Sequence, residues 1–545
     1  MMWEILVTEP VHESGLKILS SDSSVNLKQR MGMSRAELLE AVADVHAMIT
    51  RSGTPLDSEV LAAGKCLKAV ARAGVGVDNI DLAEASRRGI VVINAPTGNT
   101  LAATEHTFAL MLSVCRKLPQ AHLSLVGGQW ERKRFIGSQL SGKNLLIVGL
   151  GRIGSRVAVR AKAFGMNVLA FDPYVSTKRA EEIGVSLVPD LEGALALADV
   201  VTLHTPMTEE TRHIIDERML RAFKTGAVLI NCARGRLVDG NACAEALRGG
   251  RLAGAGFDVF PFEPPENHPL FADDLRDRVV LTPHIGANTR EAQSAVSEIA
   301  ASNLLAALKD EPYEHAVNLP FMEHRLSPSR RHFLSLSRKI GAFAGSIMEA
   351  APERMTLNRR GDIFNDENII CFENPYRHSA YAVAALKGVL EVRHGPETNY
   401  MSAPLMAAER GLQVEEGRGP SSTYHNLMEL ELAGEGKSVQ ITATVTEDGK
   451  HRVVNINGYW IDCIPEGNLI VFQNHDRPGV IGKVGSLLGE LGINIANFAL
   501  GRKNGSGLAL GVLQVDSEVQ PPVLKRLRSV GDLLWAEAVR LEEGL

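Results

Sequence analysis

The glycines of residues 149–154 (Gly-Leu-Gly-Arg-Ile-Gly) lie between an apolar run and a helical pattern. In such a loop Gly149 permits a tight turn, Gly151 lets the backbone approach a pyrophosphate, and Gly154 lets the helix pack close to the strand. The helix N-terminus offers unpaired N–H groups and partial positive charge to the phosphates. Asp172 ends the next apolar run, where it can accept hydrogen bonds from ribose hydroxyls and repel a 2′-phosphate. The spacing predicts a dinucleotide site that favours NAD over NADP.

Three polar residues that could act on a substrate each follow a later apolar run. Arg234 lies where a guanidinium could hold a substrate carboxylate through two hydrogen bonds. His284 can exchange a proton near neutral pH, and Glu263 could orient it and stabilise its charged form. Taken singly, each is more often a surface ion pair or an ordinary loop residue. Together at strand ends of one nucleotide-binding unit they favour a catalytic site, although the sequence alone does not prove that Glu263 and His284 pair.

Positively charged loops in the first hundred residues are candidates for an anion site. Arg51 and Ser52 follow one apolar run, Arg72 to Val75 follow another, and Asn99 follows a third. Two cations, a hydroxyl and loop N–H groups suit a phosphate or a second anionic group of a substrate. On the residues alone, a pair of surface cations is an equally good interpretation of Arg51 and Arg72.

The elements that must position these residues alternate between short apolar runs and helical patterns. This alternation predicts a parallel α/β unit in the first hundred residues, with strands at 5–7, 47–49, 68–71 and 90–93. A helix at 101–115 leads to a doubly wound sheet, with strands at 144–148, 166–171, 200–203, 227–231, 254–258 and 279–281. The helical stretch 288–309 then returns the chain to the first unit.

The C-terminal part carries two further patterns. Prolines and mixed charge at 320–330 predict a linker, and alternating residues at 439–456 predict a hairpin at the end of a region that begins near 331. From 469 to 541 the order strand, helix, strand, strand, helix, strand is ferredoxin-like. Asp476 before Pro478 and Gly479 suits a capped helix start.

The composition indicates a soluble protein of several domains. Among 545 residues, 45% are hydrophobic and 22% charged, and the net charge of −6 gives no support for binding nucleic acid or an anionic membrane. No apolar stretch approaches the ~20 residues of a membrane span. Six cysteines without a C-x-x-C motif predict reduced thiols and no metal site. We therefore expect a cytoplasmic protein without a signal peptide, or an organellar one whose targeting segment was removed.

The chain resembles the D-isomer-specific 2-hydroxyacid dehydrogenase family over about residues 1–318. Residues 144–172 look like its nucleotide loop, and the stretches 231–235, 258–265 and 282–287 look like its arginine, glutamate and histidine motifs. The resemblance implies that the arginine binds the substrate carboxylate and polarises C2. It also implies that the histidine takes the hydroxyl proton while a hydride passes to NAD, supported by the glutamate. The implied cofactor contacts are Gly149, Gly151, Arg152, Ile153, Gly154, Asp172, Thr205, Cys232, Ala233, Asp258, Gly286 and Ala287.

The similarity extends over nearly the whole chain to the long members of this family that oxidise 3-phospho-D-glycerate. It includes the basic segment 130–137, which in those members lies near the subunit interface and the active site. The resemblance implies that 3-phosphoglycerate is oxidised to 3-phosphohydroxypyruvate, the first step of L-serine synthesis. The implied substrate contacts are Arg51, Ser52, Arg72, Gly74, Val75 and Asn99. Val75 is a departure, because many relatives carry threonine there, and the lost hydroxyl puts one contact in doubt.

Two other functions compete with this interpretation. One is a dehydrogenase or reductase of the same family for another 2-hydroxy acid, such as hydroxypyruvate, glyoxylate or lactate. The C-terminal half and the pair Arg51 and Arg72 argue against it. The other is an NAD-sensing scaffold without turnover, against which the intact Arg234, Glu263 and His284 argue.

The C-terminal regions resemble an intervening domain and an ACT domain, a module that binds amino acids where two copies meet. Asn474, Asp476 and Asn494 match positions where relatives hold L-serine, although a helix cap and a turn are equally good interpretations. The resemblance implies a homo-oligomer, dimer or tetramer, with serine as its effector. Ser402 departs from the asparagine more usual in the intervening domain. The predicted domains are substrate-binding at 1–98 and 287–319, NAD-binding at 99–286, intervening at 320–460 and ACT at 466–545.

Overall fold

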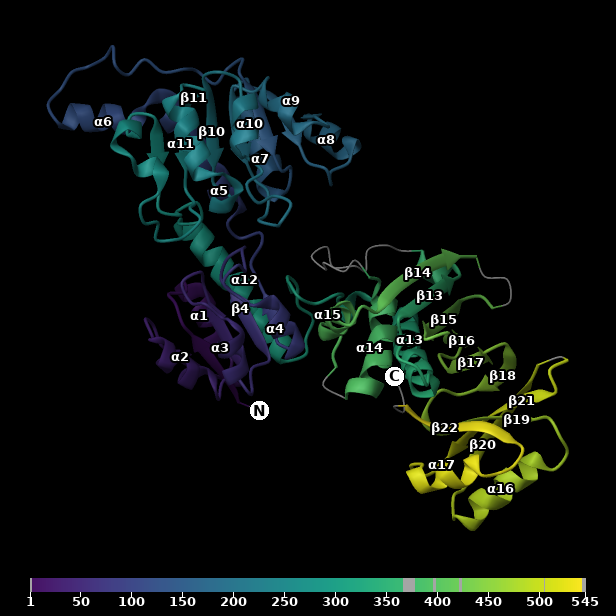
Figure 1. Cartoon of the computed structure of the whole chain (residues 1–545). Helices are drawn as coiled ribbons and strands as arrows, with labels where there is room; N and C mark the ends of the chain where they lie inside the picture. Colours follow the sequence, from purple (N-terminus) through teal and green to yellow (C-terminus); the bar gives the residue numbers. More distant parts are fainter. Residues whose placement is uncertain (1, 366–377, 396–397, 421–423, 504, 542–545) are drawn as a thin grey trace.

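The computed structural model describes residues 2–365, 378–395, 398–420, 424–503 and 505–541 (Figure 1). The first unit is a five-stranded parallel sheet in the order β2-β1-β3-β4-β5, which is the flavodoxin-like order. Its strands are β1 (Trp3–Val7), β2 (Val25–Gln29), β3 (Ala47–Thr50), β4 (Ala69–Arg72) and β5 (Val91–Ile93). The predicted parallel α/β unit is confirmed. The edge strand β2 was not predicted, because its sequence, Val-Asn-Leu-Lys-Gln, contains no apolar run.

Helices cover this first sheet, and one of them returns from far along the sequence. They are α1 (Glu13–Ser20), α2 (Arg35–Val42), α3 (Ser58–Ala63), α4 (Leu82–Arg87) and α12 (Arg290–Leu308). In α12, Ala300, Ala301 and Leu304 are buried in the same core as Ile5 and Ile49. The return of the chain predicted for 288–309 is thereby confirmed.

The second unit is a seven-stranded parallel sheet in the order β12-β11-β10-β9-β6-β7-β8. Its strands are β6 (Asn144–Val148), β7 (Asn167–Phe171), β8 (Ser186–Leu187), β9 (Val200–Leu203), β10 (Ala227–Asn231), β11 (Leu252–Phe257) and β12 (Val279–Leu281). The order reverses between β6 and β9, so the carboxyl ends of these strands flank the crevice where doubly wound sheets bind ligands. The two-residue strand β8 is too short to leave a signal in the sequence.

Helices pack on both faces of the second sheet, and short 3₁₀ turns join several elements. The helices are α5 (Thr100–Arg116), α6 (Leu118–Val126), α7 (Arg152–Ala163), α8 (Thr177–Ile183), α9 (Leu191–Leu195), α10 (Glu217–Ala222) and α11 (Gly240–Arg248). The 3₁₀ turns of the chain are η1 (Gly235–Leu237), η2 (Pro269–Phe271), η3 (Asp273–Leu275), η4 (Glu323–Arg325) and η5 (Asp362–Phe364). Helix α5 begins one residue after Asn99, so it connects the first unit directly to the second.

The third unit is a six-stranded sheet in the order β14-β13-β15-β16-β17-β18. Its strands are β13 (Arg354–Arg360), β14 (Gln413–Gly419), β15 (Leu427–Gly434), β16 (Lys437–Val445), β17 (His451–Ile456) and β18 (Tyr459–Cys463). Its helices are α13 (Pro328–Ile347), α14 (Ala380–His394) and α15 (Ser402–Glu409). The hairpin predicted at 439–456 is confirmed as β16 and β17.

The linker predicted at 320–330 is wrong in its last three residues. Helix α13 begins at Pro328, because proline at the first helical position loses no helical hydrogen bond and its ring already fixes a helical φ. Phe321 and Leu326 are buried in the core of the third unit. Pro328 therefore marks the start of a helix, and Phe321 and Leu326 bury the chain ahead of it.

The last unit has the predicted ferredoxin-like order, with an antiparallel sheet β20-β21-β19-β22. Its elements are β19 (Gly467–His475), α16 (Val480–Glu490), β20 (Ile495–Arg502), β21 (Leu508–Val515), α17 (Pro521–Arg528) and β22 (Leu533–Leu541). Leu469, Val471 and Val512 share one hydrophobic core with Ile340 and Phe343 of α13, so the third and fourth units are packed together. In the part of the chain described, no helix has the length and apolarity that crossing a membrane requires.

The prediction that Asp476 caps α16 is wrong. The residue before the helix is Gly479, whose φ of 89° lies in the left-handed region that favours glycine, and no side chain caps the first turn. The Asp476 carboxylate instead forms an ion pair with Arg502, whose Nε lies 3.0 Å away. The carboxylate therefore faces the last residue of β20 and does not cap the helix.

Candidate active site

His284 and Glu263 are in direct contact. The His284 Nδ1 lies 2.6 Å from Glu263 Oε2, and Glu263 Oε1 accepts the Phe260 N–H at 3.0 Å. Burial raises the pKa of Glu263, but the hydrogen bonds from His284 and Phe260 outweigh it and lower that pKa below its ordinary value. The carboxylate is thus ionised at neutral pH and able to stabilise a charged imidazole.

The loop that carries His284 is fastened to the buried carboxylate of Asp258. One oxygen, Oδ1, accepts from the Thr282 hydroxyl at 2.6 Å and the Ile285 N–H at 2.8 Å, and Oδ2 accepts from the Gly286 N–H at 2.7 Å. His284 itself has a φ of 52°, a left-handed conformation that is uncommon outside glycine. The fixed loop holds His284 in this conformation, with its Nδ1 against Glu263.

Arg234 lies across from the first unit, on the loop after β10. Its Nε donates to Asp78 Oδ2 at 3.1 Å, and its Nη1 donates to the Ala233 carbonyl at 2.7 Å. Nη2 lies over Gly76, where an added Cβ would be 2.1 Å away. No described residue accepts from Nη2, so this nitrogen remains for a ligand carboxylate.

Arg72 brings a second guanidinium to the same place. Burial, together with the neighbouring charges of Arg234 and Arg51, lowers its pKa to about 10, so three cations repel one another at this site. Its Nε is buried without a hydrogen-bond partner among the described residues. Its Nη1 folds over Gly74, where a Cβ would come within 1.7 Å, so a side chain there would displace the guanidinium. Three neighbouring guanidiniums, of which only Arg234 pairs with a carboxylate of the described residues, through Asp78, are suited to an anionic ligand.

The prediction that the N–H groups of the Arg51 loop bind a phosphate is wrong for three of them. The N–H groups of Arg51, Gly53 and Thr54 are not free for a phosphate, because all three donate to the carboxylate of Glu9 at 2.9–3.0 Å. Asn79 holds the same loop from the other side, donating to the carbonyls of Arg51 and Thr54. The side chains of this loop and the Ser52 N–H therefore remain for an anion, and Ser52 is exposed beside Arg51.

Val75 and Asn99 border the same region of the first unit. The Val75 carbonyl accepts from the Asn94 side chain at 2.7 Å, which fixes the loop after Arg72. Asn99 precedes α5 without capping it, and its Oδ1 is buried without a partner among the described residues. The structure thus places a free amide oxygen where the sequence predicted a substrate contact.

The nucleotide loop fits a dinucleotide. Gly149 has a φ of 95°, and a Cβ added to it would lie 2.8 Å from the backbone of His204. A Cβ on Gly154 would be 2.1 Å from the Gly149 carbonyl oxygen, so the helix could not pack as it does. Gly151, in contrast, faces open space within 4 Å, which leaves room for a pyrophosphate at the start of α7. The next residues, Arg152 and Ile153, form the first turn of α7.

Asp172 and Thr205 flank this loop. The Asp172 carboxylate accepts from the Leu150 N–H at 2.8 Å and the Tyr174 N–H at 2.9 Å, one bond per oxygen. Each carboxylate oxygen can accept two hydrogen bonds, so ribose hydroxyls can still be bound. Thr205 Oγ1 is buried without a partner among the described residues, a state that a bound cofactor would relieve.

The remaining predicted cofactor residues lie at the ends of β10 and β12. Cys232 is a buried thiol whose pKa is raised to about 12 by burial, so it stays neutral. The Ala233 N–H donates to Asn231 Oδ1, and the Ala287 carbonyl accepts from Gln293. These positions line the same edge of the sheet as Asp172 and Thr205.

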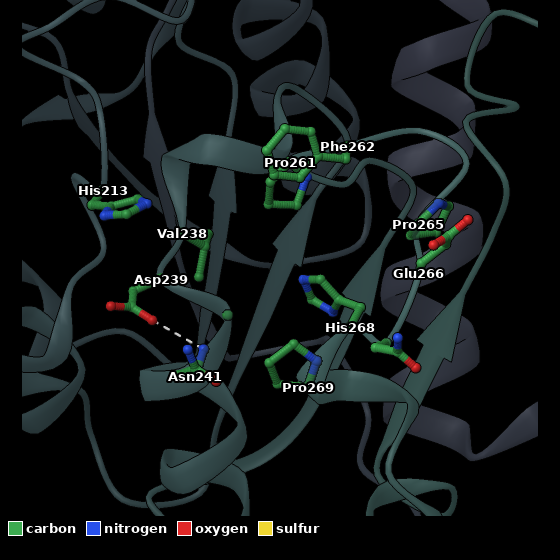
Figure 2. A pocket seen from close by; sticks show the side chains of 12 residues that line it. His213, Val238, Asp239, Asn241, Pro261, Phe262, Pro265, Glu266, His268 and Pro269 are labelled. Atoms are coloured by element: carbon green, nitrogen blue, oxygen red, sulfur yellow. Dashed lines mark hydrogen bonds between the residues drawn. The ribbon is translucent and has the colours of Figure 1, made fainter.

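A pocket of about 300 Å³ lies beside the catalytic loop (Figure 2). Pro261, Phe262 and Pro265, which flank Glu263, line one side, and His268 and the start of α11 line the other. Asp239 caps α11 there by accepting from the Asn241 N–H. None of the predicted catalytic side chains lines this pocket.

The three predicted effector residues lie in the last unit. Asn474 is buried, its Nδ2 donates to the His475 carbonyl, and its Oδ1 has no partner among the described residues. Asn494 is exposed and donates to Asp516 at 2.6 Å. Asp476 pairs with Arg502 and is accessible. The site therefore offers one unpaired buried acceptor beside two accessible polar groups.

Several residues that position this site were not predicted from sequence. Glu9, Asp78 and Asn79 follow strands of the first unit and act through loop geometry, which a single sequence does not reveal. His106 lies within a helical pattern and was assigned no role. The signals that could have singled out the first three are an acid just after β1, at Glu9, and an acid followed by an amide in the loop after β4, at Asp78 and Asn79.

Family models match three consecutive parts of the chain. They are the D-isomer specific 2-hydroxyacid dehydrogenase NAD binding domain at 108–286, the D-3-phosphoglycerate dehydrogenase intervening domain at 330–457, and the ACT domain at 468–532. Among solved structures, the TT0316 protein of Thermus thermophilus is 38% identical, with a TM-score of 0.53, and covers 58% of this chain and 99% of its own. A D-lactate dehydrogenase of Aquifex aeolicus solved with NAD and lactic acid is 28% identical, with a TM-score of 0.52, and covers 56% and 96%.

Curated relatives match the chain from end to end. The D-3-phosphoglycerate dehydrogenase of Archaeoglobus fulgidus is 39% identical over 543 residues, which is 99% of this chain and 100% of the relative. The enzymes of that name from Methanocaldococcus jannaschii and Bacillus subtilis are each 37% identical over 99% of this chain and 100% of their own. With the nucleotide loop, the paired His284 and Glu263 and both C-terminal units in place, this chain belongs to the D-3-phosphoglycerate dehydrogenase family and binds NAD.

Proposed function

We propose that this protein oxidises 3-phospho-D-glycerate at C2 to 3-phosphohydroxypyruvate with NAD, the first step of L-serine formation. The observation that carries the proposal is the convergence of Arg51, Arg72 and Arg234 at one site. A substrate with a carboxylate at one end and a phosphate at the other would neutralise this cluster, whereas a simple hydroxy acid would leave cations unpaired. An absorbance assay of NADH formation that compares 3-phospho-D-glycerate with D-glycerate and D-lactate tests the proposal.

Proton transfer falls to His284. Because its Nδ1 is engaged by Glu263 at 2.6 Å, Nε2 is the nitrogen that takes the proton of the C2 hydroxyl. The O–H electron pair then forms the C2 carbonyl as the C2–H bond breaks. Bound NAD supplies the acceptor for the hydride that leaves C2. Glu263 remains ionised and stabilises the imidazolium that results.

Arg234 holds the substrate carboxylate and the oxygen on C2. Its loop packs against the glutamate loop, since a Cβ on Gly235 would lie 2.0 Å from the Phe260 carbonyl carbon. Phe260 in turn donates its N–H to Glu263. This packing places the arginine and the histidine–glutamate pair at one edge of the sheet, so that carboxylate binding and proton transfer act on adjacent carbons.

The phosphate is assigned to Arg51 and Arg72. Arg51 lies on a loop held by Glu9 and Asn79, and Arg72 is the last residue of β4, so both backbones are already fixed before a substrate binds. Asn99, with its unpaired Oδ1, is assigned to the substrate from the N-terminus of α5. Val75 contributes backbone and apolar contact only, because it has no hydroxyl.

Asp172 is proposed to decide the cofactor. Asp172→Ala is expected to weaken NAD binding and to narrow the preference against NADP, because ribose contacts and charge repulsion are both removed. Steady-state kinetics with each cofactor measure this as the ratio of the two kcat/KM values. Asp190→Ala, which changes a carboxylate that caps α9, is the matched control. An unchanged ratio in Asp172→Ala would mean that another residue sets the choice.

We also propose that the protein is a homo-oligomer, a dimer or a tetramer. Helix α6 has no buried residue, and it stands at the outer edge of the second unit (Figure 1). Leu123, Val126 and, in the segment that follows, Trp130 and Ile136 are 67–78% exposed. Large apolar side chains gathered in this way mark protein interfaces. We therefore propose that a second copy of the chain covers α6 and the segment that follows it, which would form the oligomer interface.

L-Serine is proposed as the effector, bound by Asn474, Asp476 and Asn494 where two ACT units meet. The unpaired Asn474 Oδ1 and the Asp476 carboxylate suit an ammonium group, and the Asn494 amide suits a carboxylate. Serine alters turnover only if it favours one arrangement of the units over another. The shared core of the third and fourth units would carry such a change as one body.

Calorimetry with L-serine checks this assignment. The full chain is expected to release or absorb heat on titration, and Asn494→Ala is expected to bind more weakly because one hydrogen-bonding group is lost. Asn241→Ala, an exposed asparagine of the second unit, is the control. Absence of heat with the full chain would overturn the role of serine, and equal heat with Asn494→Ala would place its site elsewhere.

A further inference from the structure

His106 lies on α5 with its ring against the carboxylate that fastens the catalytic loop. Its Nε2 is 3.0 Å from the Thr282 hydroxyl and 3.2 Å from Asp258 Oδ1. The ring is largely buried, and its Cδ2 lies 3.9 Å from the position of a Cβ on Gly286. No step of the proposed chemistry uses this histidine.

The hydrogen-bond pattern assigns the proton of His106. The Thr282 hydroxyl has one proton, and it is donated to Asp258 at 2.6 Å. The oxygen of Thr282 can therefore only accept from His106, and the carboxylate of Asp258 can only accept as well. Nε2 must carry a proton that is shared between these two acceptors. His106 is thus a donor that completes the set of hydrogen bonds around Asp258.

Asp258 depends on this set. Burial raises its pKa, but hydrogen bonds from His106, Thr282 and the Ile285 N–H outweigh burial and lower it. A buried carboxylate that loses one donor is destabilised and no longer binds its remaining donors in one geometry. Those remaining donors are the residues on both sides of His284.

Helix α5 also touches the second catalytic loop. Cys232, two residues before Arg234, packs against the hydrophobic core to which Phe108 of α5 belongs. The helix begins directly after Asn99 of the first unit and packs against β10 and β11. It therefore contacts the arginine loop and the histidine loop while continuing from the substrate-binding unit.

We infer that His106 is a positioning residue: through Nε2 it fixes Asp258 and Thr282, and so sets the orientation of His284 toward Glu263 and the substrate. The inference rests on the proposed function, because it acts through the proton transfer assigned to His284. It gives α5 the role of aligning both catalytic loops with the unit that holds the substrate.

Three variants test the inference in the full-length protein. His106→Leu keeps the ring's approximate volume and removes the donor, and it is expected to lower kcat by ~10–10²-fold with little change in the KM for NAD. His106→Gln, whose amide N–H₂ can reach the Nε2 position, is expected to restore kcat to within about threefold of the wild type. His425→Leu, at an exposed histidine of the third unit, is the matched control and is expected to be silent.

The split between kcat and KM separates positioning from mere stability. With the loop loosened, His284 is displaced from the position that proton transfer needs, whereas the glycine loop that holds NAD is untouched, so kcat falls and the KM for NAD does not. A lower melting temperature with unchanged kcat would overturn the inference. Failure of His106→Gln to restore kcat would also overturn it. Wild-type turnover of 3-phosphoglycerate tests the proposed function separately, so the two failures are distinguishable.

Discussion

Replacing His284 with alanine is expected to lower kcat for 3-phosphoglycerate by ~10²–10⁴-fold, the usual effect of losing an acid–base group. NAD binding is expected to stay nearly unchanged, because the glycine loop and Asp172 lie on other strands. Stopped-flow or steady-state rates measure the first effect, and fluorescence titration with NADH measures the second. His425→Ala is the matched control, since that histidine is exposed in the third unit.

The pH dependence of the wild type tests the pairing of His284 with Glu263. Burial raises the pKa of Glu263, but hydrogen bonds from His284 and Phe260 outweigh it and lower that pKa below its ordinary value, so the carboxylate is ionised throughout the neutral range. In a pH–rate profile, the support that Glu263 gives to His284 is therefore expected to persist as the pH falls and to be lost only below the ordinary titration range of a glutamate. A near-wild-type kcat in purified His284→Ala would show that the proton goes elsewhere.

Replacing Arg72 with methionine is expected to cost ~10²-fold in kcat/KM for 3-phosphoglycerate, the scale of lost charge-assisted hydrogen bonds. Activity with D-glycerate, which has no phosphate, should change little. The substitution also removes a buried cation that Arg51 and Arg234 repel, so the fold should not be destabilised. Steady-state kinetics with the two substrates measure the change in their ratio.

Arg30→Met is the matched control for Arg72→Met. Arg30 is an exposed cation of the same unit, and its replacement should leave kcat/KM for both substrates unchanged. An equal loss with 3-phosphoglycerate and D-glycerate in Arg72→Met would contradict the phosphate assignment and point to a general role of Arg72 in the fold.

Much of the candidate site could be predicted because its chemistry depends on a few residues at strand ends. Gly149 and Gly154 each meet a backbone constraint that only glycine satisfies, whereas Gly151 faces open space. Arg234, Glu263 and His284 each follow a strand of one parallel sheet, and carboxyl ends of parallel strands share one edge. Pattern and topology together therefore placed these residues near one another.

The unpredicted part depends on three-dimensional contacts between distant loops. Glu9 binds the N–H groups of a loop more than forty residues away, which turned a predicted phosphate contact into an internal one. His106 looks like any polar residue of an amphipathic helix until Asp258 and Thr282 are seen against it. Edge strand β2 and the short β8 carry little buried surface, so neither produces an apolar run.

The central claim is that this site oxidises a phosphorylated 2-hydroxy acid. The most direct test is NADH formation by the purified wild-type protein with NAD and, in parallel, 3-phospho-D-glycerate, D-glycerate and D-lactate. The account predicts turnover of 3-phospho-D-glycerate with kcat/KM ~10²-fold or more above that of D-glycerate, because the arginines pair with the phosphate. Equal or higher kcat/KM with D-glycerate or D-lactate, or no NADH from any of the three, would contradict it.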